Sequence, residues 1–259
     1  MEKESGWSRL LQAKKSLWFP YSCKLESALP RLFCFPYGGG NAVIFQQWQS
    51  LLENQVHVYP VQLPGRGMRL QEPSYTELEP LIEELAKVCL PYLDRPYYLF
   101  GHSMGALIAY ELACYLQKNK QSSPRHLIVS GFRAPHLPNS KPPIHSLPTQ
   151  QFVAEIAKMN GTPREILENP EYLELFLPSL RADFQLCETY TYQKKEPLQA
   201  PLTAFGGKED PEVTIDMLAE WKHHTSCQFR LIRFPGDHFF IHQEEKAVVK
   251  QIGKIVEEG

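Results

Sequence analysis

Short apolar segments alternate with amphipathic ones along most of the chain. Six runs rich in Val, Leu, Ile and Phe predict strands at 31–36, 56–63, 96–101, 126–131, 201–207 and 227–234. Segments with helical spacing of apolar residues lie between or after them, at 43–53, 76–93, 104–118, 213–224 and 243–257. Buried strands that alternate with helices indicate the α/β class, with a mostly parallel sheet covered by helices on both faces.

One long segment, 135–196, departs from this alternation. Ten of the 22 prolines lie between Pro135 and Pro201, and no strand pattern appears there. Helical patterns do appear, at 149–159, 171–177 and 177–192. We interpret 135–196 as a helical insertion between two parts of one core, 31–134 and 197–259, and expect it to form a lid over an active centre. The alternative is a helical subdomain that only packs its apolar stripe on the core.

Composition and charge narrow the function classes. The chain has 259 residues, of which 43% are hydrophobic, and this is enough for a substantial core. The net charge of −2 and the lack of a basic stripe argue against a nucleic-acid partner. No run of 18 apolar residues occurs, so we expect no stable membrane insertion.

The first 30 residues carry no motif and no apolar stretch typical of a secretory leader, so we expect a loosely packed arm on a cytoplasmic protein. The cysteines form no C-x-x-C pair, and we expect buried free thiols in a reducing compartment. No ligand spacing for zinc is present. The expectation is therefore a protein with no metal and no cofactor.

A candidate nucleophile lies where the third predicted strand meets a helix. The segment GHSMG, 101–105, fits G-x-S-x-G, and it is preceded by an apolar strand and followed by a helical pattern. Strand, tight turn and helix form the context of a nucleophile elbow, in which Ser103 would stand exposed at a helix N-terminus. The plain alternative is a small polar residue in an ordinary turn.

A serine needs a base, and in α/β hydrolases an acid and then a histidine follow it in chain order. Asp210 follows the strand 201–207, and His238 follows the strand 227–234, so we assign them as the acid and the base. Other residues are weaker candidates by position: His102, His57 and His242 for the base, and Glu209, Asp183 and Asp237 for the acid.

An acyl-transfer site also needs donors for an oxyanion. The N–H of Met104, directly after the nucleophile, is one candidate. The turn after the first strand supplies the other, from Tyr37 or Gly38, and Gly38 is favoured. A phosphate-binding loop is excluded there because no Gly-Lys-Ser/Thr follows. A simple flexible turn is the alternative.

Four blocks resemble one family: FPYGGG, VQLPGRGMR, FGHSMGALIAYELA and GDHFF. They are similar to those of the stand-alone type II thioesterases of polyketide and nonribosomal peptide synthesis, and of the medium-chain thioesterase that works with fatty acid synthase. The resemblance runs from about Leu32 to the C-terminus. Gly38 is a small departure, since alanine is commoner there.

This resemblance implies a Ser–His–Asp hydrolase that releases aberrant or stalled acyl groups from the phosphopantetheine arm of an acyl or peptidyl carrier protein. It implies Ser103, His238 and Asp210 as the triad, and Met104 with the FPYG turn as the oxyanion hole. We expect a monomer. Arg66, in the block LPGR, belongs to the family pattern, and its role stays open between a salt bridge and a substrate contact.

Other functions of the same fold stay open at this stage. A carboxylesterase would use the same residues on oxygen esters, and an acyltransferase would replace water by an alcohol or an amine. A binding module that keeps the fold without catalysis is the alternative from another class.

Overall fold

The computed structural model describes residues 17–22, 28–161 and 164–259. Within them the chain forms a parallel sheet of order β2-β1-β3-β4-β5-β6. Its strands are β1 Arg31–Phe35, β2 His57–Pro60, β3 Tyr97–His102, β4 His126–Ser130, β5 Leu202–Gly207 and β6 Phe229–Phe234. All six predicted strands are present, and the predicted fold class is confirmed.

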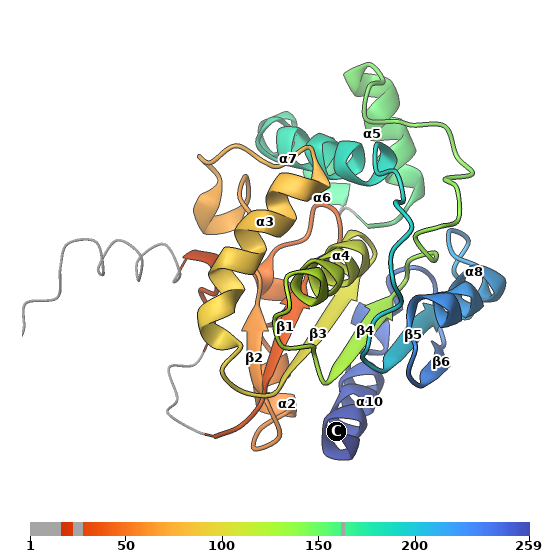
Figure 1. The fold of residues 1–259 in the computed structure, drawn as a ribbon. Coiled ribbons are helices and arrows are strands. Elements are labelled where there is room, and N and C mark those ends of the chain that lie inside the picture. The colour runs from red at the N-terminus through yellow and green to blue at the C-terminus, as the bar shows by residue number, and fades with distance from the viewer. Residues whose placement is uncertain (1–16, 23–27, 162–163) are drawn as a thin grey trace, which may run out of the picture.

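Helices cover both faces of this sheet (Figure 1). Alternate residues of a strand point to opposite faces. Thus Phe33 and Phe35 pack in the apolar cluster of one face, whereas Leu32 and Cys34 pack in that of the other. The first face carries α3 Leu78–Cys89, α4 Met104–Lys118 and α8 Ile215–Ala219, and the second carries α2 Trp48–Leu51, α9 Phe240–Gln243 and α10 Glu245–Glu258. None of the described helices is long and apolar enough to cross a membrane.

Several predicted helices are shorter than their apolar spacing indicates. The segment 43–53 consists of a 3-10 turn, Ala42–Phe45, followed by α2, and 213–224 consists of α8 followed by the 3-10 turn Glu220–His224. Side-chain caps set these starts, because Asn41 accepts a hydrogen bond from Val43 N and Thr214 accepts one from Met217 N. Further 3-10 turns are Gly67–Arg69 and Leu90–Tyr92.

The segment 135–196 contains α5 Thr149–Lys158, α6 Arg164–Glu168 and α7 Pro170–Glu188. Figure 1 shows these helices together at one end of the sheet. Phe152, Ile156 and Leu180 form an apolar cluster of their own there. The two predicted helices 171–177 and 177–192 are in fact one, because α7 continues through Pro178.

The N-terminal arm is more tightly packed than expected. Trp18 and Phe19 are buried in the main apolar cluster. Gln62 N donates to Trp18 O at 2.8 Å, and the Arg69 guanidinium lies 4.0 Å from the centre of the Trp18 ring system. The expectation of a loose arm is therefore wrong for this part of it, because two large apolar side chains need burial. The rest of the arm, 1–16 and 23–27, lies outside the described residues.

The prediction that the thiols are buried is correct for Cys34, Cys89 and Cys114. It is wrong for Cys227, which is exposed, since it comes just before the edge strand β6. Cys187 is partly buried, and Cys23 lies outside the described residues.

Gly105 allows α4 to approach the sheet closely. A methyl group at position 105 should therefore destabilise the fold. A Cβ at this position would lie 2.1 Å from Phe35 O, a backbone atom. We expect Gly105→Ala to lower the free energy of unfolding by about 3 kcal/mol, the upper end for overpacked cores, although alanine is the better helix former. Gly38→Ala is the matched control, since its Cβ would meet only Asp183 Cβ at 3.6 Å. Equal urea midpoints for the two variants would contradict the prediction.

Candidate active site

Ser103 lies on a strained turn between β3 and α4. Its φ of 52° and ψ of −120° are unfavourable for a residue with a side chain, and the surrounding structure must hold them. Ser103 N donates to Ser130 O at 2.7 Å, and Ser103 O accepts from Ala106 N at 2.9 Å. The turn is tight enough that a Cβ on Gly101 would lie 1.9 Å from Gly105 O. The hydroxyl is thus presented at the N-terminus of α4, beyond the carboxyl end of β3.

Two loops from later strands bring a histidine and an acid to this hydroxyl. His238 Nε2 lies 3.0 Å from Ser103 Oγ, and His238 Nδ1 lies 2.8 Å from Asp210 Oδ2. An ionised carboxylate only accepts hydrogen bonds, so the ring proton belongs on Nδ1 and leaves Nε2 as the acceptor facing the hydroxyl. The Asp210 side chain is fully buried, and its second oxygen accepts from the N–H groups of Glu212 at 2.7 Å and Val213 at 3.2 Å. These bonds hold the carboxylate in one orientation.

His102 lies beside the nucleophile in sequence but points away from it. Its Nδ1 lies 2.8 Å from Ser130 Oγ, and its Nε2 lies 2.9 Å from His238 O. A carbonyl only accepts, so Nε2 carries the proton and the imidazole donates to the loop that holds His238. Burial, followed by the nearby His238, lowers the pKa of His102 well below its ordinary value. No local pattern around His102 indicates this contact.

The other candidate residues lie elsewhere. His57 is buried in β2, at the sheet edge away from the hydroxyl, and His242 Nε2 shares a hydrogen bond with the Tyr37 hydroxyl at 2.8 Å. Glu209 is exposed and accepts from Gly236 N, and Asp237 accepts from Phe239 N at 2.8 Å. His242, Glu209 and Asp237 are thus engaged in local hydrogen bonds.

Tyr37, Gly38 and Met104, the residues predicted to supply oxyanion donors, line the same cavity as Ser103. Met104 is the first residue of α4, so its N–H has no partner one turn earlier in the helix. In the turn after β1, Gly39 N donates to Asp183 and Gly40 N donates to Tyr37 O. This leaves Tyr37 and Gly38 as the residues of that turn whose N–H groups have no acceptor among the described residues.

A buried ion pair connects this turn to α7. Arg66 donates to Asp183 twice, at 2.5 and 2.7 Å, and both side chains are only 3% exposed. Asp183 Oδ2 also accepts from Gly39 N at 2.7 Å, and Arg66 Nη1 lies 3.4 Å from Gly40 O. Of the two roles left open for Arg66, the structure shows the salt bridge. The pair holds the glycine turn between the LPGR loop and the helical segment.

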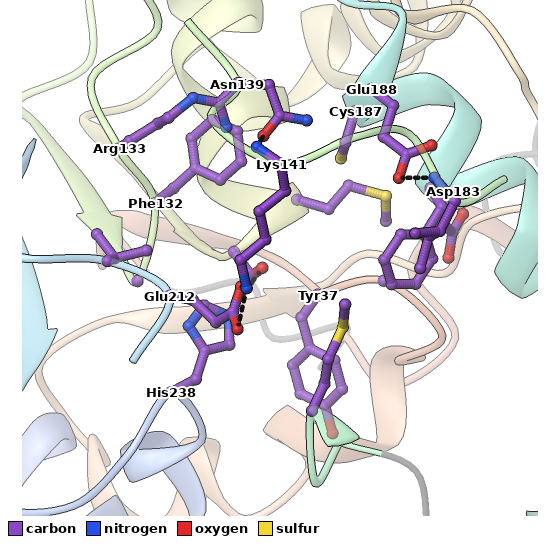
Figure 2. A pocket seen from close by; sticks show the side chains of 18 of the residues that line it. Tyr37, Phe132, Arg133, Asn139, Lys141, Asp183, Cys187, Glu188, Glu212 and His238 are labelled. Carbon is purple, nitrogen blue, oxygen red and sulfur yellow. Dashed lines mark hydrogen bonds and ion pairs between the residues drawn. The ribbon is translucent and has the colours of Figure 1, made fainter. Parts of the chain in front are cut away.

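A cavity of about 220 Å³ opens beside the hydroxyl. Ser103, His238, Met104 and Gly38 lie on one part of its wall. Apolar side chains from the segment 135–196 and from the core form much of the rest: Phe132, Ile144, Met159, Phe184, Val213 and Met217. Figure 2 shows His238 and Tyr37 at one end of the view and Arg133 with Asn139 at the other. The cavity suits a substrate with an apolar portion.

Two solved structures with this fold are titled as thioesterases. RedJ, a thioesterase of the prodiginine pathway in Streptomyces coelicolor, superposes with a TM-score of 0.82 and 39% identity, over 93% of this chain and 99% of that one. BorB, titled the type II thioesterase of the borrelidin biosynthetic cluster, gives 0.83 and 31%, over 91% and 96%. The class is therefore that of the α/β hydrolases.

The amino-acid sequence identifies the family within this class. The family model described as the thioesterase domain matches residues 30–256, so the chain belongs to this family, and it is a thioester hydrolase. The resemblance to type II thioesterases is thereby confirmed. Linear gramicidin dehydrogenase LgrE of Brevibacillus parabrevis is 48% identical over 221 residues, 84% of each chain.

Removing one partner of the Arg66–Asp183 pair should lower the free energy of unfolding strongly. Asp183→Ala leaves a buried guanidinium without a carboxylate, and we expect the free energy of unfolding to fall by about 3–5 kcal/mol. The double variant Arg66→Met/Asp183→Leu should recover much of this loss, because it leaves no buried charge. Lys158→Ala, which breaks an exposed pair with Glu155, should cost less than about 1 kcal/mol. Urea denaturation measures all three, and a double variant less stable than the single one would contradict the expectation.

The lowered pKa of His102 should make the folded protein less stable as the pH falls. Because its folded pKa lies below the unfolded value of about 6.5, the unfolded state binds the extra proton first as the pH falls. His102 therefore makes stability decline below that pH, by up to about 1.4 kcal/mol per pH unit. Burial lowers the pKa of His126 and His224 to about 4, and these add to the decline.

We expect His102→Gln to make the decline between pH 7 and pH 5 shallower in urea titrations. His223→Gln, at an exposed histidine, is the control and should follow the unmodified protein. A slope unchanged by His102→Gln would refute this role.

Proposed function

We propose that this thioester hydrolase releases acyl groups from the phosphopantetheine arm of acyl or peptidyl carrier proteins by a Ser–His–Asp acyl-enzyme mechanism. The observation that carries the proposal is the continuous set of hydrogen bonds from Asp210 through His238 to Ser103, next to the cavity. Two solved structures with the same fold are titled as thioesterases of biosynthetic pathways, and this supports the carrier-bound substrate.

In the first half-reaction His238 Nε2 takes the hydroxyl proton as Ser103 Oγ attacks the thioester carbonyl carbon. The N–H groups of Met104 and of Gly38 or Tyr37 stabilise the oxyanion of the tetrahedral intermediate. Collapse of the intermediate breaks the C–S bond. The pantetheine sulfur leaves as a thiolate that takes up the proton, and an acyl-serine remains.

In the second half-reaction His238 takes a proton from water as the water oxygen attacks the acyl-serine. The C–O bond to Ser103 breaks, the proton returns to Ser103 Oγ, and the carboxylic acid leaves. Asp210 keeps its carboxylate on Nδ1 throughout, so it holds the ring in place and stabilises the imidazolium.

We propose a lid role for 135–196, since its side chains form part of the cavity wall. A carboxylesterase or an acyltransferase would use the same residues with a different leaving group or acceptor. Parallel assays with oxygen esters, and product analysis with added alcohols and amines, separate these from thioester hydrolysis. A binding module without catalysis would leave Ser103 unlabelled by a fluorophosphonate probe.

The name of LgrE raises dehydrogenase chemistry as a second candidate. A dinucleotide site of the Rossmann type needs a third glycine in the first strand-to-helix turn. Here the turn reads GGGNAV and Val43 takes that position. In this turn, the N–H groups of Gly39 and Gly40 also already donate to Asp183 and to Tyr37 O. We therefore favour hydrolysis.

The nucleophile is tested with Ser103→Ala. We expect kcat for acyl-carrier thioesters to fall by roughly 10⁴–10⁶-fold, because the remaining groups have no hydroxyl to activate. Asp210→Asn should cost roughly 10⁴-fold, through loss of the tautomer that faces the hydroxyl. Glu209→Gln is the matched control one residue away and should stay near the unmodified rate. Near-normal hydrolysis by Ser103→Ala would rule out this nucleophile.

A further inference from the structure

The charged side chains that line the cavity are almost all paired. Asp183 is held by Arg66, as described above. Glu188 accepts from Ile144 N, His145 N and His145 Nδ1. Glu212 and Lys141 form an ion pair at 2.6 Å, which Figure 2 shows close to His238 in the view. The acids of the cavity wall therefore have partners within the protein.

Arg133 is the exception among the charged residues of this wall. It follows the carboxyl end of β4 by three residues and is partly buried. Its Nε donates to Leu137 O at 3.1 Å, and its guanidinium lies 5.1 Å from the centre of the Phe132 ring. No carboxylate of the described residues forms an ion pair with it. The two terminal nitrogens, with four N–H donors, have no acceptor among those residues.

A guanidinium without a carboxylate partner is unfavourable in this position. Burial lowers the pKa of Arg133 from its ordinary value, which reflects an unfavourable setting for the charge. Arginine nevertheless remains protonated, and its planar fork matches a carboxylate with two parallel hydrogen bonds. The guanidinium is therefore available to pair with an anion that enters the cavity.

We propose that Arg133 is a specificity-determining residue that binds a carboxylate at the far end of the acyl chain, so that the preferred substrates are thioesters of dicarboxylic acids. This inference rests on the proposed function. The apolar wall holds the methylene part of the chain, and the guanidinium pairs with the terminal carboxylate while Ser103 attacks the thioester carbonyl.

The phosphate of the pantetheine arm is the other anion in such a substrate. It lies on the carrier side of the thioester and so belongs at the cavity mouth. Lys141, with 53% of its side chain exposed, has the more exposed position of the two cations, and it is already paired with Glu212. Arg133 is the less exposed cation and packs against Phe132. These positions favour the acyl chain as the source of its partner.

The test compares chains of equal shape and different charge. Carrier proteins are loaded with malonyl, succinyl or glutaryl groups, each matched with the neutral branched acyl group of the same heavy-atom skeleton, which is isovaleryl for malonyl. For at least one length, the unmodified enzyme should show the higher kcat/KM on the charged chain. Arg133→Met should reduce that preference by roughly tenfold to a hundredfold, the range for hydrogen bonds to a charged group, and leave neutral chains close to unchanged.

Two further variants make the result specific. Arg133→Lys keeps the charge without the planar fork and should retain part of the preference. Arg125→Met removes an exposed arginine outside the cavity wall, so the net charge changes equally, and it should retain all of the preference. A preference for the neutral chain at every length overturns the proposal. An equal loss on charged and neutral chains also overturns it, because it assigns Arg133 to the phosphate that all these substrates share.

A measurement without turnover separates this inference from the proposed function. Ser103 is labelled with a fluorophosphonate in the presence of N-ethylglutaramate, which carries the distal carboxylate, or of its neutral isostere N-ethyl-5-methylhexanamide. The charged amide should slow labelling of the unmodified enzyme more than the neutral amide does, and Arg133→Met should abolish the difference. Absence of any difference in the unmodified enzyme contradicts the subsite. Protection without hydrolysis of carrier thioesters would instead keep the subsite and refute the carrier-bound substrate.

Discussion

The arrangement of this molecule depends on one constraint, which is that all strands of the sheet run parallel. Parallel strands deliver their carboxyl ends to the same edge, so the loops after β1, β3, β5 and β6 meet although they are far apart in sequence. β3 lies between β1 and β4, and β5 lies between β4 and β6. The turn with Gly38, the hydroxyl of Ser103 and the imidazole of His238 are therefore within reach of one small cavity. An antiparallel β5 or β6 would send Asp210 or His238 to the opposite edge.

The parallel sheet alone does not hold these loops in place, and buried polar contacts complete the arrangement. Asp183 connects α7 to both Arg66 and Gly39, so these hydrogen bonds join the helical segment, the LPGR loop and the glycine turn. His102 connects β4 to the loop of His238 in a similar way. Removing one member of such a contact leaves a buried polar group unsatisfied, which is why these contacts constrain geometry more strongly than exposed pairs do.

The sequence predicts those features that follow from local pattern. Each strand is a short apolar run, and the turn at Ser103 has glycines where a side chain would clash, so both could be found without coordinates. The partner of Arg66 could not, because Asp183 lies 117 residues away and nothing local distinguishes it from an exposed acid. The continuation of α7 through Pro178 could not be predicted either, for a related reason. A proline in a helix favours a break, and the apolar packing of Leu180 and its neighbours outweighs that local preference.

The charged residues near the cavity differ in whether a partner within the protein neutralises them. This difference distinguishes Arg66 and Asp183, which have structural roles, from Arg133, which we assign to substrate binding. Asp183 and Arg66 are almost fully buried and each neutralises the charge of the other, so neither charge needs a ligand as its partner. Arg133 is partly buried as well, yet most of its donors are unused among the described residues. A protein of marginal stability gains nothing from a partly buried cation that has no carboxylate partner. A bound carboxylate offsets the unfavourable free energy of this cation by pairing with it. The resulting gain in binding free energy is measurable as the difference in kcat/KM between charged and neutral acyl chains.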